Sequence, residues 1–245
     1  MNGNSNKKWL AAGAVLCALA FVGVGFSAWY VSGTTQYSFG GNVVVEDVIG
    51  GNVQVSIDPD QAEQSVVYGA PSEAVNAKTW LYSDGLSTEN LTLTYDFTFS
   101  GVTAATAFVV SVSATDSNAG GVTYTSQFGS QYNKQASYRH AVDAGYIADV
   151  SEVTITYTQS GNGGGLSYDS STNTFRFTGE NTSCEAHLTF EFHWGEEFDG
   201  QNPYSSYKDL TGETARIEAA DTLAYIAECL KEVTYSIVFT PVANV

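Results

Sequence analysis

Basic residues are scarce in this 245-residue chain. It contains nine lysines and arginines against 26 aspartates and glutamates, which gives a formal net charge of −17 at pH 7. A surface of this sign repels the phosphate backbone of nucleic acids, so we expect no nucleic-acid partner. The same acidity keeps an exported protein soluble and is compatible with weak binding of a divalent cation such as calcium.

Histidine is also rare, and the usual catalytic motifs are missing. The chain has three histidines and no His-Glu-x-x-His pair, which excludes the common zinc-protease helix. It also lacks a Gly-x-Ser-x-Gly elbow, a phosphate-binding loop and a dinucleotide-binding fingerprint. We therefore predict that the protein is not an enzyme and that it uses no organic cofactor.

Cysteine is limited to three residues, and their positions restrict disulfide formation. Cys17 lies inside an apolar N-terminal run, so only Cys184 and Cys229 belong to the body of the chain. An oxidising compartment would permit one bond between them.

Proline and methionine are few, with four and one residues, whereas tyrosine, phenylalanine and glycine are abundant. This balance favours strands and turns over helices. The clearest strand pattern is the strict alternation of large side chains from Leu91 to Phe99. The run from Phe108 to Val112 is more continuously apolar and predicts a central strand buried on both faces. Further strands are predicted at 122–128, 150–157, 174–178 and 186–194. We predict a mainly β protein: a two-sheet antiparallel sandwich or jelly roll.

One segment near the C-terminus has a helical period instead. Apolar residues recur every three or four positions, which predicts one amphipathic helix at about 213–231 that packs on the sandwich. A final alternating strand is predicted at 233–240, ended by Pro241.

An uncharged apolar segment at 9–31 follows the pair Lys7 and Lys8. The lysines are expected to stay in the cytoplasm, which places the rest of the chain outside the membrane. Residues 1–31 are therefore predicted to be a signal peptide or an uncleaved signal anchor, with cleavage near Ser27 and Ala28 in the first case. Residues 32–57 form a Gly/Val-rich segment, and 58–245 form the sandwich body.

The Gly/Val-rich segment contains a ten-residue repeat, GGNV at 40–43 and again at 50–53. Each copy opens a valine-rich run and predicts a short strand. These strands either pair within the chain or add to the open edge of a neighbouring molecule. The residues predicted to carry such assembly are Val43, Val44, Val45, Val53 and Val55.

Three weaker candidate sites lie between 187 and 207. His187, Glu191 and His193 share one strand face by even spacing and could ligate a metal. The acidic loop at 196–202 offers oxygen ligands for calcium from Glu196, Glu197 and Asp199. Aromatic rings suited to gripping a glycan flank this loop, at positions Trp194, Tyr204 and Tyr207.

The stretch 22–30 (VGVGFSAWY) resembles the glycine-rich, aromatic-ended signals of the TasA/camelysin group, which Gram-positive bacteria export through an alternate (SipW-type) signal peptidase. Residues 39–45 (FGGNVVV) resemble the first mature strand of that group. Two later blocks, 192–204 and the terminal helix with its strand, are similar to exported proteins of the same kind.

The resemblance implies an extracellular or cell-surface β-sandwich of the biofilm matrix, in which the protein assembles with itself or with other matrix proteins. Membrane contact is then expected only through the N-terminal segment. The alternatives are a monomeric module that binds a glycan or a host ligand and, less favoured, a metal-dependent hydrolase at His187, Glu191 and His193.

Overall fold

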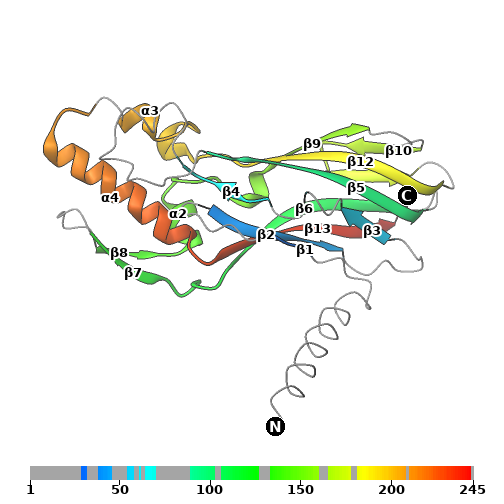
Figure 1. The fold of residues 1–245 in the computed structure, drawn as a ribbon, viewed down its shortest axis with the longest axis horizontal. Helices are drawn as coiled ribbons and strands as arrows, with labels where there is room; N and C mark the ends of the chain where they lie inside the picture. Colours follow the sequence, from blue (N-terminus) through cyan, green and yellow to red (C-terminus); the bar gives the residue numbers. More distant parts are fainter. Residues whose placement is uncertain are drawn as a thin grey trace, which may run out of the picture.

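The protein is described by a computed structural model. The described residues are 29–31, 38–45, 54–57, 61, 64–69, 89–102, 106–126, 133–159, 165–177, 181–207 and 210–243. Within them the fold is mainly β, with two sheets packed face to face and one long C-terminal helix, which confirms the predicted fold class (Figure 1). No helix in these ranges is both long enough and apolar enough to cross a membrane. Ser27, Ala28 and the apolar segment up to residue 28 lie outside the described residues.

The larger sheet has the strand order β1-β2-β13-β6-β11-β10, and β4 also pairs with β2. Its strands are β1 (Trp29–Val31), β2 (Ser38–Val45), β4 (Val66–Val67), β6 (Thr106–Asp116), β10 (Leu166–Asp169), β11 (Thr174–Phe177) and β13 (Val233–Ala243). Neighbouring strands are antiparallel except for β2 and β13, which run parallel. The first part of the described chain is thus held beside the last strand.

The smaller sheet has four strands in the order β3-β5-β12-β9, all antiparallel. They are β3 (Gln54–Ile57), β5 (Thr92–Val102), β12 (Asn181–Glu191) and β9 (Thr154–Gln159). The two copies of the GGNV repeat therefore lead into different sheets, because the first copy belongs to β2 and the second precedes β3.

Aromatic side chains fill the space between the two sheets. On β5 the alternating residues Leu93, Tyr95, Phe97 and Phe99 are fully buried, as their spacing predicts. Across the interface the ring centroids of Phe97 and Phe239 lie 4.9 Å apart. A strand of alternating character thus turns its large residues to the core and its threonines to the outside.

Strand β6 is central in its sheet, as predicted, but it is buried on one face only. Phe108 and Val110 are buried, whereas Val109 is half-buried and Ser111 is exposed. No helix of the described ranges covers the outer face of this sheet, so the strand alternates like those of other open antiparallel sheets. The prediction of burial on both faces was therefore wrong.

The final strand also differs from its predicted bounds. β13 runs through Pro241 to Ala243, and Pro241 pairs with Phe108 of β6. The paired register of β2 and β13 stops at Phe239, so among the described residues no strand pairs with β13 on that side at Pro241, and the missing N–H of proline breaks no pairing there.

Helix α4 (Glu213–Leu230) lies beyond one end of the sandwich, beside the hairpin of β7 (Val122–Thr125) and β8 (Asn133–Ala136) (Figure 1). The Tyr225 hydroxyl donates to the Gln135 carbonyl at 2.6 Å, and Asp221, fully buried, accepts from the Tyr124 hydroxyl at 3.0 Å. The helix exists as predicted, but it packs on α2 (Tyr138–Asp143) and on this hairpin, at the end of the sandwich rather than across its face.

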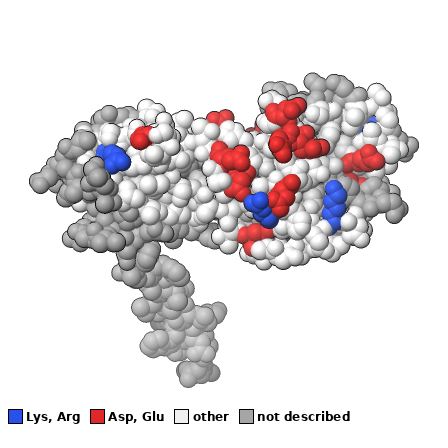
Figure 2. Space-filling view, turned by 180° about the vertical axis from the view of Figure 1, so that it is seen from behind, with Lys and Arg blue, Asp and Glu red and all other residues white. Residues whose placement is uncertain are grey.

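Short helical segments complete this end of the molecule. They are α2 (Tyr138–Asp143), α3 (Tyr204–Tyr207) and two 3₁₀ turns at Val150–Glu152 and Glu196–Phe198. Figure 2 shows that acidic side chains outnumber basic ones on the face it presents and gather toward the half that carries α4.

Candidate functional site

A cavity of about 460 Å³ opens where β5 begins and β12 ends. The antiparallel pairing of the two strands brings these ends together, because Thr92 at the start of β5 lies opposite Glu191 at the end of β12. The turn that follows the 3₁₀ helix at Glu196–Phe198 supplies the third wall. The lining residues are Glu89, Asn90, Leu91, Thr92, Glu191, Phe192, His193, Trp194, Gly200, Gln201 and Asn202.

Glu89 organises one wall of this cavity. Its Oε1 accepts a hydrogen bond from Trp194 Nε1 at 2.5 Å and another from Asn202 Nδ2 at 3.0 Å. Asn202 Nδ2 also lies 2.7 Å from the Gly69 carbonyl oxygen. These bonds join three segments that are distant in sequence, so the carboxylate is held in place before any ligand arrives.

Buried aromatic rings support the wall from behind. Tyr68 packs edge-on against Trp194 with ring centroids 5.0 Å apart, and its hydroxyl donates to the His193 carbonyl at 3.3 Å. Burial, with a smaller contribution from the nearby Glu89 charge, raises the pKa of Tyr68 far above its ordinary value. The phenol of Tyr68 therefore stays neutral beside Glu89.

The predicted metal ligands His187, Glu191 and His193 are not brought together. They follow one strand direction, and at about 3.3 Å per residue His187 lies about 13 Å from Glu191. The His187 ring contacts Asp96 Oδ1 at 2.7 Å, and His193 Nε2 lies 3.0 Å from Thr154 Oγ1. Even spacing correctly placed His187 and Glu191 on one face, but it cannot bring them within ligand distance.

The contact between Asp96 and His187 predicts a pH-dependent contribution to stability. The hydrogen bond from His187 lowers the pKa of Asp96 below its ordinary value of 3.8, and a bond from Gln61 Nε2 at 2.6 Å acts in the same direction. A lowered carboxyl pKa stabilises the fold above that ordinary value, and the contribution is lost as the pH falls through the lowered value. Solvent screening limits it to less than about 1 kcal/mol.

We therefore expect Asp96→Asn to reduce the free energy of unfolding slightly at pH 5, and this difference to shrink as the pH falls below 3.8. Urea unfolding at a series of pH values measures this difference. Glu185→Gln, an exposed change on the same sheet face, serves as the control. A deficit of Asp96→Asn that persists at the lowest pH would show that the contact does not act through the Asp96 charge.

The carboxylates of the acidic loop are not gathered around one point in the described residues. Glu196 and Glu197 are exposed in the first turn of a 3₁₀ helix, and Asp199 ends that turn in the left-handed conformation with φ of 52°. Among the described residues no group of three His, Cys, Asp or Glu side chains is arranged to hold a metal ion. The loop instead contributes the Gly200–Asn202 wall of the cavity.

The predicted aromatic platform is incomplete. Trp194 is only 4% exposed, because it packs against Tyr68 and Phe198, so it offers no open ring face to a sugar. Tyr207 is half-buried against Phe198, and burial raises its pKa to about 12. The side chain of Tyr204 lies outside the described residues. The prediction that Trp194 presents its ring is wrong, since the alternation of buried residues on β12 continues past the end of that strand through Phe192 and directs Trp194 inward.

Cys184 and Cys229 are both buried and are not joined by a disulfide, so the candidate bond between them is not formed. Cys184 lies opposite Phe99, which packs near Phe239, whereas Cys229 lies before the start of β13 at Val233. Those ends of β13 are about 20 Å apart, which no disulfide spans. Burial raises the pKa of the Cys229 thiol to about 11, so it stays protonated.

The predicted assembly valines divide into two groups. Val43, Val44 and Val45 lie on β2, paired in parallel with Ile237, Val238 and Phe239 of β13. Val55 lies on β3, is 4% exposed and belongs to the core of its own chain. Val53 lies outside the described residues. Val43, Val44 and Val45 thus lie on a strand that stands between β1 and β13, whereas β3 is itself the edge strand of the smaller sheet.

Sequence patterns did not indicate the contribution of Glu89 or Asn90 to the cavity. Both precede an alternating strand and read locally as an ordinary polar strand start. Their role depends on the long-range register that places Thr92 opposite Glu191, and no local signal specifies that register. Gln201 and Asn202 lie in the acidic loop at 196–202, and no local pattern indicates that they line a cavity.

No protein-family model, curated protein or solved structure matches this chain.

Proposed function

We propose that the protein is an exported structural subunit of TasA-like type, which acts at the cell surface or in an extracellular matrix and self-associates by exchanging strand β2. The observation that carries this proposal is the parallel pairing of β2 with β13. Neither strand contains a charged residue, from Ser38 to Val45 or from Val233 to Ala243.

The absence of charge matters because unprotected strand edges invite pairing with other chains. Soluble proteins usually guard such edges with lysine or other charges, or with short strands and bulges. If β2 withdraws, the long edge of β13 is left with none of these guards over the register Thr234–Phe239. The β2 strand of a second copy can then restore the same backbone hydrogen bonds, as in other strand-exchange assemblies.

Another edge of the sandwich is closed by side chains. Gln64 Nε2 donates to the Thr94 carbonyl at 2.5 Å, and Gln64 Oε1 accepts from the Thr94 N–H at 3.1 Å. Gln61 Oε1 similarly accepts from the Asp96 N–H at 2.5 Å. The amide groups thus imitate a neighbouring strand along the first half of β5, and this favours β13 over β5 as the edge for exchange.

Export is supported by the N-terminal sequence. The apolar segment at 9–31 follows Lys7 and Lys8, and few basic residues occur after it. The acidic, β-rich body is suited to an extracellular setting.

Strand exchange predicts a covalent cross-link between two differently marked chains. Val44 and Val238 are Cα partners, and neighbouring strands are about 4.8 Å apart, which suits a disulfide. We expect that a mixture of Val44→Cys and Val238→Cys proteins, assembled and then oxidised, yields a mixed dimer on a non-reducing gel. Only a strand that has moved to a second molecule can join these two cysteines.

Two control experiments accompany this cross-linking test. A Val44→Cys/Val238→Cys double variant should form the bond within one chain, which shows that the geometry permits it. A mixture of Val44→Cys with Thr156→Cys, which lies exposed on β9, should give no specific dimer. If the double variant cross-links internally but the mixture of single variants never does, β2 stays in its own chain and strand exchange is excluded.

A further inference from the structure

We propose that the cavity between the ends of β5 and β12 binds a small molecule that bears an ammonium group, such as an amino sugar or a diamine. The first argument is the charge of its lining. It contains two carboxylates, Glu89 and Glu191, and among the described lining residues no lysine or arginine. An anionic ligand such as a phosphate or a sugar acid would meet repulsion there, whereas a cation would be attracted.

The state of the two carboxylates provides the second argument. Both hydrogen bonds to Glu89 end on Oε1, so among the described contacts Oε2 has no donor. Glu191 is exposed and has no hydrogen bond or ion pair within the described chain. The two groups are thus available to accept hydrogen bonds from an ammonium group, which is a donor with three N–H bonds.

The rest of the lining suits hydroxyl groups on the same ligand. Thr92, Gln201 and Asn202 provide hydroxyl and amide groups, which donate and accept hydrogen bonds. The cavity volume of about 460 Å³ lies within the range of small-molecule sites, roughly 300–1,000 Å³. Since Trp194 does not expose its ring face, recognition depends on charge and hydrogen bonds rather than on stacking.

The net charge of the whole molecule also favours binding of a cationic ligand. At a formal net charge of −17, the protein raises the local concentration of cations near its surface. Binding should therefore weaken as the salt concentration rises.

The test is a titration of the full exported protein with three probes, followed by two-dimensional NMR or calorimetry. Glucosamine carries the ammonium and the hydroxyls, N-acetylglucosamine is its neutral counterpart, and putrescine carries ammonium groups alone. We expect glucosamine or putrescine to bind, with N-acetylglucosamine weaker by roughly tenfold or more. Binding of both amines assigns the recognition to charge, and binding of glucosamine alone shows that the hydroxyls are required.

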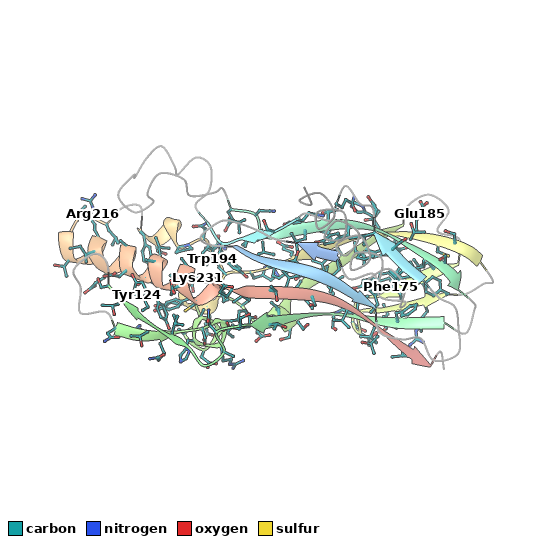
Figure 3. All side chains as sticks on the ribbon, turned by 60° about the horizontal axis from the view of Figure 1, so that its bottom comes forward. Tyr124, Phe175, Glu185, Trp194, Arg216 and Lys231 are labelled. Carbon is teal, nitrogen blue, oxygen red and sulfur yellow. The ribbon has the colours of Figure 1, made fainter. Side chains whose placement is uncertain are left out.

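Glu191→Gln is the variant of choice, because this exposed side chain makes no contact that the fold needs. It should weaken amine binding by roughly tenfold while the unfolding midpoint stays unchanged. Glu185→Gln removes the same charge from an exposed position toward the other end of β12, well away from Trp194 and the cavity, and should have little effect (Figure 3). The proposal is overturned if neither amine binds, if N-acetylglucosamine binds equally well, or if the two variants behave alike.

Discussion

Gly195→Ala is expected to lower the free energy of unfolding by about 3 kcal/mol or more. A methyl group at this position would lie 2.1 Å from the Gly145 carbonyl oxygen and 2.5 Å from the Gly145 carbonyl carbon. The backbone of Gly195 is extended, with φ of −84°, so conformation does not require glycine there. Glycine is required because the main chain at Gly195 passes close to the main chain at Gly145.

This approach is fixed by hydrogen bonds on both sides. Gly195 N donates to the Tyr146 carbonyl at 3.0 Å, and Glu197 N donates to the Gly145 carbonyl at 2.9 Å. The segment cannot move away from the added methyl without breaking this pairing, which also positions the last residues of the cavity wall.

Thermal unfolding followed by circular dichroism measures the effect, and we expect the melting temperature of Gly195→Ala to fall by roughly 10 °C. Gly120→Ala is the control, because an added methyl there would meet nothing within 4 Å. Equal melting temperatures for the two variants would show that the contact of residues 145 and 195 is not close in solution.

Phe99→Ala should destabilise the sandwich by about 3–5 kcal/mol. Phe99 is fully buried and joins the two sheets, since its ring centroid lies 5.4 Å from that of Phe177 and 5.7 Å from that of Phe239. Removing the ring leaves a cavity, because strands on both sides hold the surrounding rings in place. Their backbones are fixed by ladder hydrogen bonds and cannot collapse into the gap.

Urea unfolding of Phe99→Ala and Phe99→Leu separates this cavity from other effects. Leucine refills part of the volume and should cost about 1.5 kcal/mol or less. Thr98→Ala, the outward neighbour on β5, should change stability by at most about 1 kcal/mol. A loss for Phe99→Ala no larger than that for Thr98→Ala would contradict a core position for the ring.

The strands that could be predicted from the sequence are those in which large and small or polar side chains alternate along the strand itself. Leu93 to Phe99 alternates strictly, and so does Val233 to Phe239, and both are strands with their large residues buried. The helical period after residue 213 likewise predicted α4. In each case a repeat of two or of 3.6 residues specifies the element without reference to the rest of the chain.

What covers an element could not be predicted in the same way. The apolar face of α4 could pack on a sheet, a hairpin or another helix. In the structure it lies against α2 and the hairpin of β7 and β8, where Tyr124 and Gln135 hydrogen-bond to α4. The sequence likewise does not predict that β2 pairs in parallel with β13, since a valine-rich strand can pair with many neighbouring strands. The cavity forms only through such long-range pairing. The role of Glu89 in its wall could therefore not be predicted from the residues around it.

The place of β13 has a consequence for synthesis. This strand lies between β2 and β6 and contributes Tyr235, Ile237 and Phe239 to the interior. Until it has left the ribosome, the larger sheet is missing its middle strand, and such distant pairings also form slowly. A chain that does not yet contain β13 therefore cannot close the larger sheet, because β2 and β6 then have no strand between them.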